Sequence, residues 1–159
     1  MAFGQESENN GSPQSKENDI VKRNFIATNP VKPIIGLLNL NYEYQIRKKI
    51  GISAYSEILA YTVISDFNHP DAINTIGFSF YPFMDHLTIN QGAFINLNTS
   101  YILYFRDDSI VNSFANGIHI GYKWLFRKNL FLEPKLLLNY TYENKEVLPG
   151  LEILMGVNF

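Results

Sequence analysis

The last ten residues of the chain, 150–159, alternate in polarity with a period of two. Successive side chains of a β-strand point to opposite faces of the sheet, so this period is typical of a strand. One face of the segment is apolar throughout and carries Leu151, Ile153, Met155, Val157 and Phe159. The other face is mixed and includes Glu152 and Gly156. The pattern predicts that the chain ends in a strand with one apolar face.

The same alternation recurs in seven earlier segments, which polar and turn-forming residues separate at short intervals. The expected strands cover residues 20–30, 36–45, 50–64, 74–83, 91–105, 114–126 and 130–142. Short strands in regular succession are typical of an all-β sandwich or barrel. A tilted strand needs roughly 9–11 residues to cross a bilayer, and these segments reach that length. Eight is also an even number, as bacterial single-chain membrane barrels require.

Apolar runs are too short for membrane helices. The run from Ile34 to Leu38 contains Gly36 and is far below the roughly 18 residues that a spanning helix needs. We therefore expect an all-β fold, an eight-stranded antiparallel up-and-down transmembrane β-barrel over residues 19–159. Residues 1–18 contain almost no apolar side chains and are expected to form a disordered lead.

Composition excludes several classes of function. The net charge is -2 and no basic patch is present, so no nucleic-acid partner is expected. The chain has no cysteine, which excludes disulfides, thiolate metal sites and thiol nucleophiles. Glycine-rich phosphate loops and nucleotide fingerprints are absent as well. We expect no cofactor.

The more apolar face of the strands is bulky, because the chain contains 12 Phe and 10 Tyr. The interior of an eight-stranded barrel holds only its own side chains or one small ligand. That face is therefore expected to point outward to lipid. Its rings lie near the segment ends, where aromatic girdles meet the two membrane interfaces. The expected girdle residues are Tyr42, Tyr44, Phe105, Phe114, Trp124, Phe126, Tyr140 and Tyr142.

The opposite face is rich in Gly, Asn, Ser and Thr and also carries charged residues. The side chains expected to form an interior polar network are Glu43, Glu57, His119, Lys123, Glu133, Lys135 and Glu152. Charges taken from water persist when they are paired and hydrogen-bonded. We expect a packed ion-pair network, helped by Lys22 or Arg23, that fills the lumen.

Two stretches carry a resemblance to a known group. The terminal strand ends in Phe159, and residues 36–44 read Gly-Leu-Leu-Asn-Leu-Asn-Tyr-Glu-Tyr. In these features the chain resembles the small eight-stranded outer-membrane barrels, the group of OmpX and the membrane domain of OmpA. The likeness is one of pattern and covers about residues 20–159.

The resemblance implies a place in the bacterial outer membrane and contact with outer-membrane lipid. It also implies that the terminal strand is an assembly signal read by the barrel-assembly machinery. The residues of that signal are Leu151, Ile153, Met155, Val157 and Phe159. A monomer is expected.

Loop lengths predict an orientation, because outer-membrane barrels have short periplasmic turns and longer extracellular loops. The turns at 47–49, 84–90 and 127–129 are expected to be periplasmic. The loops at 65–72, 106–112 and 143–149 are expected to be extracellular. Both termini then lie in the periplasm.

Catalysis is not expected. Lipid A deacylases are barrels of similar size with a His-x-Ser motif on the lipid-facing wall, but the residue two after His119 is Gly121, and His119 faces inward. Glu133 and Lys135 are more consistent with a structural ion pair than with an acid/base pair. His69 and His86, in a loop and a turn, offer too few ligands for a metal site.

The function that fits these features is an integral outer-membrane barrel protein that acts as a structural or surface-contact protein of the bacterial envelope. A narrow channel for small solutes or ions is an alternative, which is favoured if Glu57, Lys123 and Glu133 are unpaired and a water path exists. A soluble lipocalin-like carrier of an apolar ligand is a second alternative. Its interior would have to be the face rich in Phe and Leu.

Overall fold

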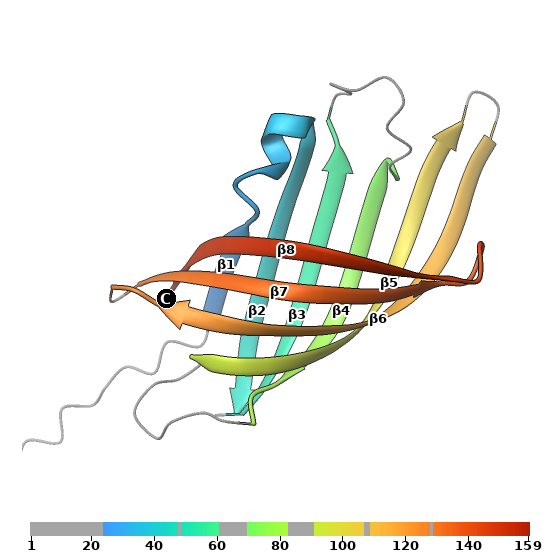
Figure 1. Ribbon diagram of the computed structural model, residues 1–159. Helices are drawn as coiled ribbons and strands as arrows, with labels where there is room; N and C mark the ends of the chain where they lie inside the picture. The colour runs from blue at the N-terminus through green and yellow to red at the C-terminus, as the bar shows by residue number, and fades with distance from the viewer. Residues whose placement is uncertain (1–23, 48, 61–69, 83–90, 107–108, 128) are drawn as a thin grey trace, which may run out of the picture.

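The computed structural model describes residues 24–47, 49–60, 70–82, 91–106, 109–127 and 129–159. Eight strands form one closed barrel in which each strand is antiparallel to the next and β1 also pairs with β8 (Figure 1). The strands are β1 (Asn24–Thr28), β2 (Leu37–Arg47), β3 (Ile50–Leu59), β4 (Ala72–Phe80), β5 (Gly92–Arg106), β6 (Ser109–Leu125), β7 (Leu130–Thr141) and β8 (Glu146–Asn158). The predicted all-β, eight-stranded antiparallel up-and-down barrel is confirmed.

Two predicted loops are wrong in their extent. β6 begins at Ser109, and Ile110 pairs with Phe105, so most of the loop expected at 106–112 is strand. β8 likewise begins at Glu146 within the loop expected at 143–149. Polar side chains suggested loops there, but backbone pairing continues through them because ladder hydrogen bonds do not involve side chains. Residues 1–18, most of the loop at 65–72 and the turn at 84–90 lie outside the described residues.

The two ends of the barrel are different. One end, here called the terminal end, holds the start of β1 and the C-terminus, where the backbones of Asn24 and Phe159 hydrogen-bond to each other (Figure 1). The opposite end, here called the η1 end, holds η1 (Lys32–Ile35), a short 3-10 turn between β1 and β2. Gly36 follows η1 with a φ of 88°, a left-handed conformation that lets the chain turn into β2. Among the described residues, no helix is long and apolar enough to span a membrane.

The strands are staggered around the barrel. A row of paired residues runs from Tyr42 through β3 to β7 and reaches β8 at Val147. In the other direction the same row passes through Ile26 and reaches β8 at Val157. These two positions are ten residues apart, so the strands must tilt against the barrel axis for the sheet to close.

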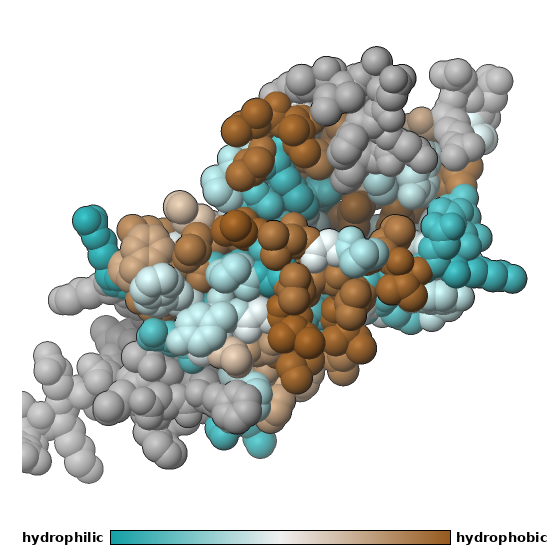
Figure 2. Space-filling view, in the orientation of Figure 1, coloured by the Kyte–Doolittle hydropathy of each residue, from teal (hydrophilic) through white to brown (hydrophobic). Residues whose placement is uncertain are grey.

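Apolar and polar side chains are separated by the wall. Large apolar residues are exposed on the outer surface of every strand, from Ile26 on β1 to Val157 on β8. Figure 2 shows apolar side chains across the middle of the face formed by β7 and β8, and hydrophilic ones at the turn between these strands. The buried side chains are mostly polar, and an apolar cluster of Phe25, Ala27, Phe131 and Leu154 lies inside the terminal end.

Candidate functional site

Seven charged side chains that alternate in sign form a continuous chain through the lumen, here called the ion chain. In order from the η1 end, the chain consists of Glu57, Lys32, Glu152, Lys135, Glu133, Lys123 and Glu43. After the pair of Glu57 and Lys32, the Nζ to carboxylate-oxygen distances are 2.9, 3.0, 3.9, 3.2 and 2.7 Å in that order. Each lysine lies between two glutamates, so every charge has at least one partner of opposite sign in the low-dielectric interior.

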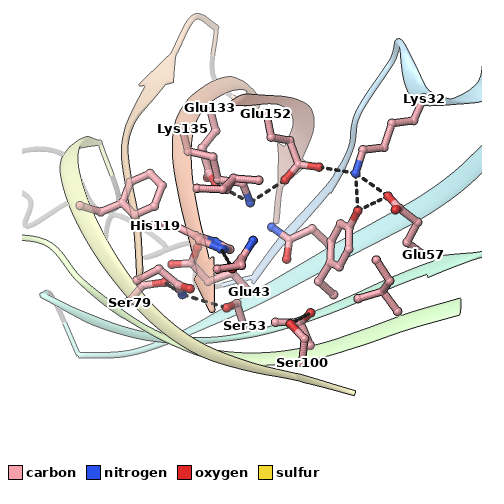
Figure 3. A pocket seen from close by; sticks show the side chains of 18 residues that line it. Lys32, Glu43, Ser53, Glu57, Ser79, Ser100, His119, Glu133, Lys135 and Glu152 are labelled. Atoms are coloured by element: carbon pink, nitrogen blue, oxygen red, sulfur yellow. Dashed lines mark hydrogen bonds and ion pairs between the residues drawn. The ribbon is translucent and has the colours of Figure 1, made fainter. Parts of the chain in front are cut away.

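Lys32 reaches into the lumen from η1 and forms the outer part of the ion chain (Figure 3). Its ammonium donates to Glu57 and to the Tyr55 hydroxyl at 2.7 Å, and it pairs with Glu152. Burial lowers the pKa of Lys32, but the carboxylates of Glu152 and Glu57 outweigh burial and raise the pKa above the ordinary 10.5. Lys32 thus joins η1 to strands β3 and β8.

Lys123 occupies the most enclosed position of the ion chain, with a relative exposure of 1 %. It pairs with Glu43 and Glu133 and donates to the Tyr81 hydroxyl at 3.0 Å. The Tyr81 hydroxyl donates in turn to Glu43 at 2.7 Å. Two carboxylates and a phenol hydroxyl of the protein therefore surround this ammonium.

Aromatic rings surround Lys123 on its other side. Its Nζ lies 4.5 Å from the ring centre of Phe25 and 5.1 Å from that of Phe131, distances at which cation–π attraction operates. These two rings meet edge to face at 5.7 Å and pack with Leu154. An apolar layer thus lies across the lumen at the terminal end.

A cavity of about 130 Å³ lies in the lumen beside the ion chain. Its wall includes the carboxylates of Glu43, Glu57, Glu133 and Glu152, and Figure 3 shows these side chains converging from opposite sides of the barrel. His119 also lines the cavity, and its Nε2 lies 3.0 Å from Oδ1 of Asn139. The cavity is polar and large enough for a few water molecules.

Small residues make room for these interior side chains. A Cβ atom built on Gly117 would lie 2.1 Å from Oδ1 of Asn139 and 2.7 Å from Oδ1 of Asn98. Register places Gly117 between these two asparagines on neighbouring strands. Glycine is therefore required there for the amides to fit inside the barrel.

The structure brings together the side chains expected in the interior. Six of the seven expected residues are members of the ion chain, and His119 lies beside it in the cavity wall. The seventh member is Lys32, which lies between the expected strands 20–30 and 36–45 and was not expected in the network. Lys22 and Arg23, named as helpers, lie outside the described residues. The segment 31–33 gave no signal for Lys32, since one lysine in a turn has no periodicity.

The expected girdle residues are all exposed on the outer wall. Tyr44 and Trp124 lie on strands toward the terminal end, and Phe105 and Tyr142 lie toward the η1 end. The five residues of the expected assembly signal are also exposed, on the outer face of β8. Their roles in lipid contact and assembly remain predictions.

The geometry offers little for catalysis or metal binding. His119 faces the lumen, and the residue two positions later, Gly121, has no side chain that could supply a hydroxyl. Across the described ranges, no group of three His, Cys, Asp or Glu side chains could hold a metal ion. Chemically, the ion chain can hold the strands together and fill the space between them.

Comparison with known proteins supports the fold. No family model matches this sequence, and no curated protein matches it. Among solved structures, the N-terminal β-barrel domain of OprF from Pseudomonas aeruginosa matches with a TM-score of 0.59 and 15 % identity. The match covers 87 % of this chain and 98 % of that chain. The two share a barrel fold. The resemblance inferred from the sequence pattern is confirmed for the fold.

Proposed function

We propose that this chain is an integral protein of the bacterial outer membrane that acts as a structural or surface-contact protein of the envelope. The observation that carries the proposal is the inversion of the usual soluble pattern: bulky apolar side chains cover the outside, and charges fill the inside. Soluble monomers rarely expose apolar patches larger than a few hundred Å². A closed barrel also leaves no unpaired strand edge, as lipid requires.

A filled lumen favours a structural role over transport. The channel alternative is favoured if Glu57, Lys123 and Glu133 are unpaired and a water path exists, but each of these residues takes part in the ion chain. The cavity of about 130 Å³ has room for only a few water molecules. The apolar layer around Phe25 and Phe131 then opposes passage through the terminal end.

The soluble carrier is disfavoured for a different reason. A carrier of an apolar ligand needs the Phe- and Leu-rich face inside the barrel. Residues of that face, such as Leu97, Phe114 and Leu138, are exposed on the outer wall instead. The lumen of this barrel offers ionised groups to a ligand, and an apolar molecule gains nothing from them.

Orientation and assembly belong to the same proposal. We infer that both termini lie in the periplasm, since two of the three connections at the terminal end, those after β2 and after β6, are short turns like the periplasmic turns of bacterial outer-membrane barrels. The exposed residues of β8, from Leu151 to Phe159, are the surface that barrel-assembly machinery would contact. The closed barrel needs no second copy to pair its strands, which supports a monomer.

Refolding tests the proposal directly. Urea-solubilised protein is diluted into buffer with or without detergent micelles, and β-structure is followed by circular dichroism. Folding only with micelles is the expected result, because the outer wall needs an apolar solvent. A folded monomer in plain buffer would overturn the membrane assignment. Conductance in planar bilayers then separates the two membrane functions, and a steady ion current through the wild-type barrel would favour the channel.

A further inference from the structure

The β5–β6 hairpin continues past the closed part of the barrel at the η1 end (Figure 1). Its own pairing runs without a break to Arg106 and Ser109. The neighbouring ladder between β6 and β7 ends earlier, where the backbone N–H of Tyr142 donates to the carbonyl of Phe114 at 3.0 Å. Residues 109–113, here called the β6 edge, therefore pair with β5 alone among the strands that the structure describes.

The β6 edge offers backbone donors and acceptors. In an antiparallel ladder, the N–H and C=O of successive residues point alternately to the two neighbouring strands. Since the carbonyl of Phe114 points to β7, the backbone groups of Asn112 and Ile110 point the same way. Within the described ranges, nothing hydrogen-bonds to these two N–H and two C=O groups. The end of the hairpin stands apart from the turn between β7 and β8 in Figure 1.

The opposite edge of the same hairpin is closed. The backbone N–H of Asp71 donates to the carbonyl of Leu103 at 2.9 Å, and the Asp71 carboxylate accepts from the N–H of Phe105. Proteins usually protect a free strand edge with a charged side chain, a proline or a bulge. The β6 edge reads Ser-Ile-Val-Asn-Ser and has none of these, and its register with β5 is regular. The β6 edge is thus the side of the hairpin that is ready to pair.

The β6 edge lies beyond an aromatic pair on the outer wall. The rings of Tyr101 and Phe114 lie 5.2 Å apart, and such rings settle at the boundary between hydrocarbon and headgroups. Asn112 and Ile110 are the next two outward positions past Phe114. Ile110 is 66 % exposed, and its cross-strand partner Phe105 is exposed as well. A strand added beside β6 would cover part of Ile110 and satisfy the open backbone groups in one contact.

We propose that the β6 edge binds an extended segment of a partner protein, which adds to the hairpin as a further β-strand. The spacing of the open groups of Ile110 and Asn112 matches the backbone of an extended chain, and main-chain hydrogen bonds give the affinity in strand addition. An apolar residue of the segment beside Ile110 would add a cross-strand side-chain contact. The inference rests on the proposed surface-contact role and names the surface that makes the contact.

Two other occupants fit this edge less well. Asn24, where β1 begins, lies at the terminal end, so the chain that precedes it joins the barrel opposite to the β6 edge. Two copies in one membrane are related by an axis along the membrane normal. Barrel strands tilted by roughly 35–45° from that axis would cross steeply between the copies instead of pairing. A segment of another protein that approaches the η1 end meets neither obstacle.

Peptide selection on the folded barrel tests this contact. A phage-displayed library of linear peptides is selected on the wild type in micelles, and the affinity of each enriched peptide is measured by fluorescence anisotropy. Asn112→Pro removes one N–H of the β6 edge, and proline is tolerated at strand edges. The affinity should fall about tenfold, the scale of one hydrogen bond. Asn112→Thr keeps the N–H and is the matched control, and Ile110→Pro removes the other donor if Asn112→Pro does not fold.

The outcomes separate the β6 edge from the membrane assignment. A selection that enriches no peptide overturns strand addition, and so do peptides that bind Asn112→Pro as well as the wild type. Loss of binding in Asn112→Thr also overturns it, because the side chain and not the backbone then makes the contact. A barrel dimer that Asn112→Pro abolishes would assign the edge to a second copy. A chain that folds without micelles fails the proposed function itself, and circular dichroism of each variant shows folding before affinities are compared.

Discussion

The two ends of the ion chain hold similar groups in different surroundings. At the terminal end, Lys123 is 1 % exposed and contacts two carboxylates, a tyrosine hydroxyl and two aromatic rings. At the η1 end, Lys32 is 23 % exposed and also contacts two carboxylates and a tyrosine hydroxyl. The ligands are nearly the same. The two sites differ in their access to water. This access decides how much the free energy of unfolding falls when either lysine is replaced.

Water access matters because an unpaired charge can be stabilised in two ways. Near solvent it can be rehydrated, and in a dry site it can only be neutralised. Lys123 is 1 % exposed and lies against the rings of Phe25 and Phe131, so water cannot easily replace it between Glu43 and Glu133. Lys32 is 23 % exposed, so water can reach the position of its ammonium between Glu57 and Glu152. We therefore expect the terminal end to be the part of the interior that is sensitive to loss of its lysine. The η1 end should tolerate loss of its lysine better.

Lys123→Met is expected to have the largest effect. Among the described residues, the variant leaves Glu43 without a cation and Glu133 with only Lys135 at 3.9 Å. Removing one partner of a buried pair costs about 3–5 kcal/mol, because the remaining charge is uncompensated. The free energy of unfolding, measured with urea in micelles, should fall by that amount. An unchanged midpoint would mean that water reaches the terminal end.

A double variant separates charge from packing. In Lys123→Met with Glu43→Gln, the glutamine is neutral and still accepts a hydrogen bond from Tyr81. Part of the lost stability should return, since fewer uncompensated charges remain. If the double variant is no more stable than Lys123→Met, the loss comes from packing against the rings of Phe25 and Phe131 and not from the uncompensated charge.

Gly156→Ala tests how closely the backbones of β8 and β1 pack at the terminal end. A Cβ on Gly156 would lie 2.1 Å from the carbonyl oxygen of Ile26 and 2.8 Å from Cα of Ala27, where β8 pairs with β1. Backbone cannot move aside as a flexible side chain can, so we expect a loss of about 1–3 kcal/mol, the range for overpacking. Gly150→Ala is the control nearer to the η1 end of the same strand. Its Cβ would meet only Leu137 at 3.3 Å, and the change should stay within about 0.5 kcal/mol.

Much of this arrangement could be predicted from the sequence. A period of two assigns Glu43, Lys123 and Glu152 to one face, and the small volume of an eight-stranded lumen indicates that this face is inside. The number of strands follows from counting the alternating segments. These inferences need only local pattern and the size of the barrel.

Other features depend on information that the pattern lacks. A shift by two residues between neighbouring strands keeps every side chain on its face, so the sequence cannot distinguish registers that pair Lys135 with Glu152 from those that do not. Lys32 was missed because its side chain enters the lumen from η1, and a turn has no period to read. The strand from Ser109 was missed because polar residues at a strand end resemble a loop.

Lys32→Met is expected to have a smaller effect than either change at the terminal end. Glu152 keeps Lys135 at 3.0 Å as a partner, and Glu57 keeps the Tyr55 hydroxyl. The Lys32 side chain is 23 % exposed, so water can replace the ammonium. The expected loss in the free energy of unfolding is about 1 kcal/mol. A loss as large as that of Lys123→Met would contradict the proposed difference between the two ends.

The smallest effect is a pH dependence that distinguishes Lys32 from a neutral side chain. Its pKa is raised in the folded protein, because the carboxylates of Glu152 and Glu57 outweigh burial. A group with a raised pKa stabilises fully below its unfolded pKa of about 10.4, and this contribution is lost as pH rises through the folded pKa. The stability difference between wild type and Lys32→Met should therefore stay constant from about pH 7 to 10 and shrink above that range. Urea midpoints in micelles at stepped pH measure it. If the difference already shrinks near neutral pH, groups other than Lys32 titrate there. Water access to Lys32 would then not explain the difference in stability between the two ends of the ion chain.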